Sequence, residues 1–121
     1  MFPNSFRHQH RRHRASRAVL SVCVALLILG GVSAAAPKSR THTVALRGMR
    51  NVPGTLVVKA GDTVVWRNED VVPHTATDKG KGFDSGNIEP GASWSYVARR
   101  KGTYSYYCAY HPNTTGRLVV R

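Results

Sequence analysis

The chain of 121 residues is poor in cysteine, methionine and acidic residues, with two, two and six of them respectively. Beyond residue 36 it also lacks helical periodicity of useful length, internal repeats and low-complexity tracts. A chain this short has room for one domain and a targeting segment, which excludes a large enzyme with separate cofactor and substrate domains. His42 is isolated in the sequence and no acid-base pair is visible, so we expect that the protein is not an enzyme.

The chain contains no apolar run long enough for a typical membrane span. The longest run covers residues 18–29 and ends at Gly30-Gly31, whereas a span needs about 20 apolar residues. Five arginines precede the run and small residues follow it, which is the pattern of a signal peptide. We therefore predict a signal peptide over residues 1–36, cut after Ala34 or within two or three residues of it, with an uncleaved anchor as the alternative. We expect an exported protein, in the periplasm, the cell envelope or outside the cell.

Acidic residues are too few to balance the basic ones. Six Asp and Glu stand against 18 Lys and Arg, and loss of the five signal-peptide arginines would leave thirteen, a net charge of +7. An excess of this kind suggests an acidic protein partner or an anionic surface. Nucleic acid is not expected as a partner of an exported domain.

Cysteine is scarce enough to leave one thiol alone. Cys23 lies in the predicted signal peptide, so Cys108 would be the single cysteine of an exported domain, where thiols normally pair. A buried inert cysteine and an intermolecular disulfide are two explanations. Metal ligation is a third, because a thiolate bound to a metal is neither free to oxidise nor available for disulfide exchange.

The part of the chain from Arg40 onward alternates apolar and polar residues in short runs, which Gly, Pro and Asp interrupt. This pattern is typical of an all-β domain. The predicted strands are residues 41–46, 55–58, 63–67, 71–77, 93–98, 103–108 and 117–120, and residues 78–89 are expected to form a loop anchored by Phe83 and Ile88. About seven short strands predict a two-sheet Greek-key β-sandwich over residues 37–121.

Two residue types that bind soft metals stand together where a predicted strand ends. The segment reads Tyr107-Cys108-Ala109-Tyr110-His111-Pro112, and a further histidine, His74, lies 34 residues before Cys108. A thiolate with two imidazoles on a rigid β-sandwich is the signature of a type 1 copper site. Cys and His also serve zinc, but structural zinc sites usually have four strong ligands, and three are evident here.

Two blocks of sequence resemble the plastocyanin-like cupredoxins, and amicyanin and its bacterial relatives most of all. The first block is Val57-Val58-Lys59-Ala60-Gly61-Asp62-Thr63-Val64-Val65-Trp66-Arg67-Asn68, followed by Val72-Pro73-His74-Thr75. The second is Gly102-Thr103-Tyr104-Ser105-Tyr106-Tyr107-Cys108-Ala109-Tyr110-His111-Pro112, followed by Gly116-Arg117-Leu118-Val119-Val120. The resemblance implies a cupredoxin fold with one copper ion per chain, bound by His74, Cys108 and His111.

The resemblance also exposes a departure from the family. Its short ligand loop carries an axial methionine, and the corresponding residue here is Thr114. Thr114 could approach the copper through its hydroxyl, a water could bind, or the site could stay three-coordinate. Met49 is the only methionine of the predicted mature chain and is a further candidate for the axial ligand, although we favour core packing. Without a thioether ligand, we expect a lower reduction potential than in methionine-ligated relatives.

The function implied by the resemblance is electron transfer to and from a redox partner protein, which could carry an acidic docking surface. His111 would be the partly exposed ligand through which electrons pass, with Tyr110 and Pro112 beside it. Thr75 would support the site by hydrogen bonding to the second ligand loop, and we expect a monomer. A copper-binding or copper-delivery protein of the same fold, without an electron-shuttle role, is the alternative.

Overall fold

The computed structural model describes residues 30–121, within which residues 35–121 form one compact unit. Residues 30–40 have no regular secondary structure. The predicted signal peptide falls mainly on residues 1–29, which lie outside the described residues. Over residues 30–121 no helix is long and apolar enough to cross a membrane.

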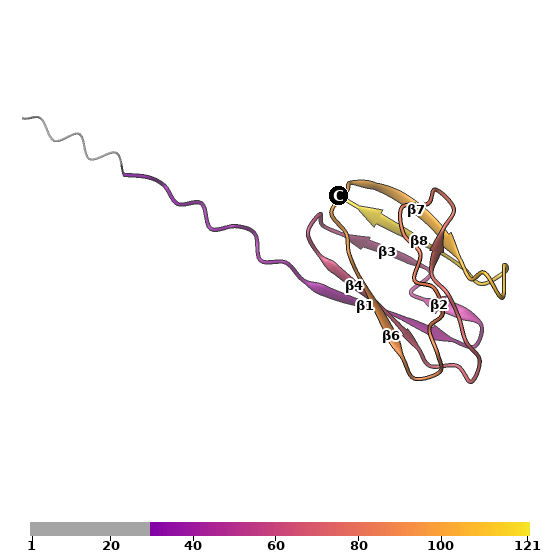
Figure 1. Ribbon diagram of the computed structural model, residues 1–121. Coiled ribbons are helices and arrows are strands. Elements are labelled where there is room, and N and C mark those ends of the chain that lie inside the picture. The colour runs from indigo at the N-terminus through magenta and orange to yellow at the C-terminus, as the bar shows by residue number, and fades with distance from the viewer. Residues whose placement is uncertain (1–29) are drawn as a thin grey trace, which may run out of the picture. The chain divides into compact units, whose positions relative to one another are not determined.

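Eight β-strands form two sheets of four (Figure 1). The first sheet has the order β2-β1-β4-β6, with β1 at Thr41–Arg47, β2 at Arg50–Val52, β4 at Thr63–Asn68 and β6 at Ser93–Val97. The second has the order β3-β8-β7-β5, with β3 at Thr55–Val58, β5 at Thr77–Asp78, β7 at Gly102–Tyr107 and β8 at Thr115–Val120. β1 and β4 are parallel, as are β3 and β8, and the other pairs are antiparallel. The predicted all-β sandwich is confirmed.

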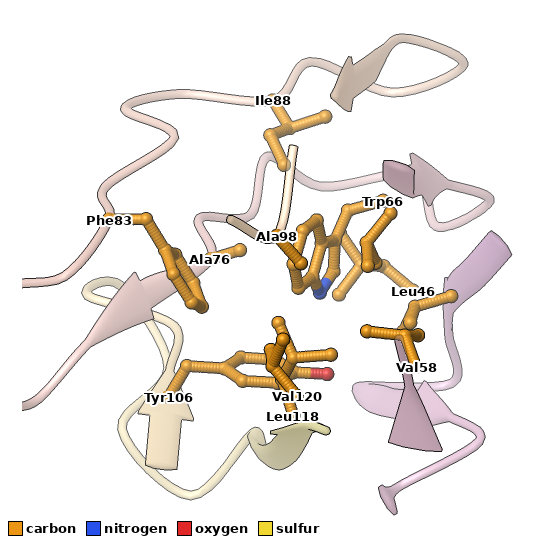
Figure 2. Packing of buried hydrophobic residues seen from close by; sticks show 12 residues of the cluster. Leu46, Val58, Trp66, Ala76, Phe83, Ile88, Ala98, Tyr106, Leu118 and Val120 are labelled. Atoms are coloured by element: carbon orange, nitrogen blue, oxygen red, sulfur yellow. The ribbon is translucent and has the colours of Figure 1, made fainter. Parts of the chain in front are cut away.

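The core lies between the sheets and is organised around Trp66, which is fully buried on β4 (Figure 2). Alternation along β4 also points Val64 and Asn68 inward, as the period of two of a strand requires. The ring of Tyr106 on β7 meets Trp66 edge-on, with centroids 5.4 Å apart. Phe83 and Ile88 are buried in the same core, which confirms their prediction as anchors of the loop.

The prediction of a strand over residues 71–77 is wrong for most of that segment. Only Thr77 belongs to a strand, β5, whereas His74 forms an isolated bridge with Ile88. Pro73 has no backbone N–H to donate to a ladder. The buried amide of Asn68 bonds instead to the carbonyls of Val72 and Ile88, at 2.8 and 2.9 Å. This side chain replaces the partner strand that the segment lacks.

A short strand, β2, was not predicted. It follows β1 through a two-residue turn at Gly48 and Met49, whose φ angles are 60° and 62°. Arg47 and Arg50 are paired across this turn, which is the arrangement of a tight hairpin. Methionine gives no sequence signal for positive φ, so the turn could not be recognised. The hairpin matters because it lies beside the candidate site.

Candidate metal site

The three predicted metal ligands come from two connections at the same end of the sandwich. Cys108 directly follows β7, and His111 lies in the loop that joins β7 to β8. His74 lies in the connection between β4 and β5. Figure 1 shows the loop after β7, in yellow, at the opposite end of the sandwich from the start of β1 and from the C-terminus.

His74 is fully buried, and its two ring nitrogens have different surroundings. Nε2 lies 2.8 Å from Oδ2 of Asp70, while the buried Nδ1 has no hydrogen-bond partner. An ionised carboxylate only accepts hydrogen bonds, so this contact places the ring proton on Nε2. Nδ1 then keeps its lone pair, as a metal ligand requires.

Asp70 is a functional residue that sequence reasoning missed. Besides His74 it accepts backbone hydrogen bonds from Gly48 and Met49, at 2.6 and 3.0 Å. Burial acts to raise the pKa of this carboxyl, but the hydrogen bonds from Met49, His74 and Gly48 outweigh it and hold the pKa below the ordinary value. Asp70 is therefore ionised over the neutral range. The available signal was its position four residues before His74.

Cys108 and His111 lie beside the segment of His74. The rings of His74 and His111 meet edge-on with centroids 5.3 Å apart. The backbone N–H of Thr75, the residue after His74, donates to the buried Sγ of Cys108 at 3.3 Å. Each of the other two predicted ligands is thus in contact with the segment that carries His74.

The loop from Cys108 to Thr114 is closed by its own hydrogen bonds. The N–H of Cys108 donates to the carbonyl of Thr114 at 2.9 Å, and the N–H of Thr114 donates to the carbonyl of His111 at 2.8 Å. The N–H of Ala109 donates to Oγ1 of Thr75 at 2.8 Å, which confirms the predicted link between Thr75 and this loop. The backbone around the thiol is therefore held from both sides.

Thr114, the residue at the expected axial position, is buried and 3% exposed. Its hydroxyl donates a hydrogen bond of 2.8 Å to the carbonyl of Met49. The side chain of Met49 is 41% exposed, so its interpretation as core packing is wrong. Met49 contributes to this region through its backbone, since its N–H contacts Asp70 and its carbonyl contacts Thr114.

The outer edge of the site is formed by the loop that carries His111. His111 is half-buried, in contrast to the fully buried His74 and Cys108. Its neighbour Tyr110 is 52% exposed, and Pro112 is exposed as well. The loop therefore presents one imidazole and two largely apolar side chains to the solvent.

Across residues 30–121, no group of three or more His, Cys, Asp or Glu side chains is assembled as a complete metal cluster. The rings of His74 and His111 meet, whereas the Sγ of Cys108 contacts the backbone N–H of Thr75 rather than another predicted ligand. The unpartnered Nδ1 of His74 and the buried, unpaired thiol of Cys108 are nevertheless the kind of donors that a transition metal would satisfy. A thiolate with imidazoles suits copper or zinc.

Comparisons with known proteins give the family. The profile of the cupredoxin-like domain matches residues 19–120. Chloroplastic plastocyanin of Fritillaria agrestis is 37% identical over 84 residues, which cover 57% of this chain and 51% of the relative. Amicyanin of Paracoccus versutus is 28% identical over 95 residues, which cover 74% of this chain and 71% of the relative. The chain thus spans about half the length of the first relative.

Solved structures agree with the sequence comparison. A Cu(I) form of an amicyanin variant superposes with a TM-score of 0.64 and 29% identity, over 67% of this chain and 82% of the other. An oxidized amicyanin variant gives a TM-score of 0.63 at the same identity and coverage. The resemblance seen in the sequence is confirmed. The chain belongs to the family of cupredoxin-like proteins.

Proposed function

We propose that this protein binds one copper ion through His74, Cys108 and His111 and acts as a small electron carrier. The observation that carries the proposal is the buried Nδ1 of His74, which has no partner in a region that also contains the Sγ of Cys108 and the ring of His111. Unpaired buried polar atoms are uncommon in folded proteins, and a bound ion is one recognised explanation. The match to amicyanin in its Cu(I) form supports copper rather than zinc.

Copper, when bound, supplies a one-electron couple between Cu(II) and Cu(I). The residues of this chain keep the donor atoms in place during that change. Asp70 fixes the orientation and tautomer of His74. Thr75, the next residue, is tied to the loop of Cys108 by two hydrogen bonds, because its N–H donates to Sγ of Cys108 and its hydroxyl oxygen accepts from the N–H of Ala109. An N–H donor to the sulfur also withdraws charge from the thiolate, which is a recognised means of adjusting the potential of a copper site. A rigid donor set favours fast electron transfer.

The route for electrons in this proposal is the exposed edge of His111. Its half-buried imidazole is flanked by Tyr110 and Pro112, which present an apolar surface to a partner. His74 and Cys108 are fully buried, so a partner would not reach them directly. The partner would be a redox protein, and the carrier itself would act as a monomer. Export through the signal peptide over residues 1–36 would bring the carrier to the periplasm or the cell envelope.

Thr114 bears on the reduction potential. Its hydroxyl proton is already donated to Met49, which leaves oxygen lone pairs as the only contribution that this side chain could make to a metal. Oxygen is a harder donor than a thioether and favours the cupric state. Thr114→Met should therefore raise the reduction potential, whereas Thr115→Met, on the neighbouring exposed residue, should leave it unchanged.

The first experiment is loading of the purified protein with Cu(II), followed by visible and paramagnetic resonance spectroscopy and titration with a reductant. We expect an intense thiolate-to-copper band in the red that bleaches reversibly. Cys108→Ser should abolish the band, while His42→Gln, at the other end of the sandwich, should leave it intact. The His42 variant is a suitable control because this histidine contacts Asp62 rather than the candidate site.

The same experiment separates the carrier from its alternative of the same fold. Tight binding of Cu(I) without a stable cupric form would indicate copper storage or delivery, and would refute electron transport. A weak, tetragonal spectrum that survives Cys108→Ser would refute the ligand set as well. Binding of zinc in preference to Cu(I) would refute the assignment of the metal.

A further inference from the structure

The basic residues are concentrated at the end of the sandwich opposite the candidate metal site. The strand registers define this end, because β1 begins there beside β4, and β8 ends there beside β7. Figure 1 shows the start of β1 and the C-terminus at the same end. Nine basic side chains lie at this end or on the connections that reach it, and we call them the basic end: Lys38, Arg40, Lys59, Lys79, Lys81, Arg99, Arg100, Lys101 and Arg121.

Most of the excess side-chain charge of the domain lies at or near the basic end. All nine side chains are exposed, and eight of them line hollows of the surface there. The two side-chain carboxylates among them are Asp62 and Asp78, which gives the side chains of this end a net charge of +7. The other half has four arginines, Arg47, Arg50, Arg67 and Arg117, and four carboxylates, Glu69, Asp70, Asp84 and Glu89, which balance.

The two carboxylates of the basic end are turned inward. Asp62 is 4% exposed and accepts hydrogen bonds from the N–H groups of Arg40 and Lys59 and from the ring of His42. Asp78 is 5% exposed and accepts a hydrogen bond from the N–H of Gly82. Across residues 30–121, the ion pairs of lysine and arginine side chains are limited to Arg47 with Glu69. The charges of the basic end therefore lack internal partners and are available to an external anion.

The charge of the basic end favours a membrane surface as that anion. Its nine basic side chains are exposed, and all of them lie beyond residue 36, so they remain after the predicted cleavage of the signal peptide. Clusters of lysine and arginine bind anionic lipid headgroups by electrostatic attraction. An interface with a protein would also be expected to have an apolar centre depleted of charge. Of the large apolar side chains exposed in the described part, Val57 and Val97 lie near this end, on different sheets.

We propose that the basic end docks on membrane surfaces rich in anionic lipid headgroups, with the loop of His111 facing away from the membrane. This orientation leaves the edge formed by Tyr110, His111 and Pro112 open to a soluble partner. The proposal does not depend on copper, since none of the nine side chains belongs to the candidate metal site. It can therefore be tested on the metal-free protein, and it can fail while the proposed function stands.

The test is sedimentation of the exported, metal-free protein with vesicles at low salt. One set of vesicles is phosphatidylcholine alone, and in the other a third of the lipid is phosphatidylglycerol. We expect binding to the anionic vesicles only, and release by added salt because the attraction is screened. Equal binding to both sets would indicate insertion of apolar residues and would overturn the proposal, as would the absence of binding to either.

Two matched triple variants locate the contact. The first replaces Arg99, Arg100 and Lys101 by Gln, and the second replaces Arg50, Arg67 and Arg117 by Gln at the balanced half; all six side chains are exposed. The first should weaken vesicle binding roughly tenfold or more. The second, which removes the same charge, should change it by less than about threefold. Equal weakening of vesicle binding in both variants would mean that net charge alone acts, and would refute the proposal. Preferential binding of poly-glutamate over the anionic vesicles would assign this end to an acidic protein partner, and would refute the proposal as well.

Discussion

The hydroxyl of Thr114 donates a hydrogen bond of 2.8 Å to the carbonyl of Met49, which lies 65 residues earlier in the chain. This bond connects the loop of Cys108 to the turn of the β1–β2 hairpin. The same turn donates two N–H groups to Asp70, which in turn holds His74. One short turn thereby stabilises both segments that carry the predicted ligands.

Removal of the Thr114 hydroxyl should therefore cost stability. Thr114→Val keeps the shape of the side chain but leaves the carbonyl of Met49 without its donor, and we expect the free energy of unfolding to fall by about 1 kcal/mol. Urea denaturation of the metal-free protein would measure this. Thr115→Val, on the exposed neighbour, should change the value by less than about 0.5 kcal/mol. Similar losses in both variants would contradict the role of the bond.

Asp70→Asn should weaken copper binding without unfolding the protein. The neutral amide no longer fixes the ring proton of His74 on Nε2, and the loss of such a partner typically lowers metal affinity by about 10- to 100-fold. Competition with a chelator would measure the affinity, and the nitrogen chemical shifts of His74 in the metal-free protein would report its tautomer. Glu89→Gln, an exposed carboxylate elsewhere on the domain, is the matched control. An unchanged tautomer in the Asp70 variant would refute this role.

Gly116→Ala should be strongly destabilising, because the surface of Gly116 is covered by the ring of Tyr106. A Cβ at this position would overlap Cζ and the hydroxyl oxygen of Tyr106 and would lie 2.7 Å from Cε2. Tyr106 is buried against Trp66 and has little room to move. We expect a loss of about 1–3 kcal/mol in the free energy of unfolding. Gly54→Ala, whose Cβ would meet nothing closer than 3.8 Å, should lose much less, and equal losses would contradict this explanation.

Asp62 should make the domain sensitive to acid. Hydrogen bonds from the backbone of Arg40, the ring of His42 and the backbone of Lys59 lower the pKa of its carboxyl from 3.8 to about 2. Because the pKa is lower in the folded state than in the unfolded state, this carboxylate contributes stability above about pH 4, and the contribution is lost as the pH falls towards 2.

The Asp62 prediction is tested with Asp62→Asn. The unfolding free energy of this variant should fall less steeply between pH 4 and pH 2 than that of the unmodified protein. Asp84→Asn, which removes an exposed carboxylate, is the matched control and should keep most of the original slope. The same slope in the Asp62 variant and the unmodified protein would refute the assignment.

The sequence was sufficient for the features that depend on local pattern. Alternation of apolar and polar residues predicted the sandwich, and the predicted end of the strand near Cys108 matches the end of β7 at Tyr107, so Cys108 and His111 lie in the loop that follows. Their role as ligands stays a prediction. Thr75 was expected to bond to that loop, and it does. Each of these features can be inferred from a few neighbouring residues.

Features that depend on long-range contacts could not be predicted in the same way. The segment of residues 71–76 contains β-branched residues, but a side chain of Asn68 and the chain at Ile88 satisfy its backbone instead of a strand. Met49 had no visible reason to approach the site, because its contribution comes from its backbone in a turn with positive φ. Such roles become visible only when segments distant in the sequence are brought together.

The uneven distribution of charge has a consequence for encounters in solution. A molecule with its net charge at one end behaves as an electric dipole, and its field orients it before any contact is made. In the proposed electron transfer, a strongly acidic redox partner would be steered to the end remote from His111, where electron exchange would be slow. Productive encounters would therefore depend on short-range apolar contact at Tyr110 and Pro112, and should become more frequent as salt suppresses the misdirected ones.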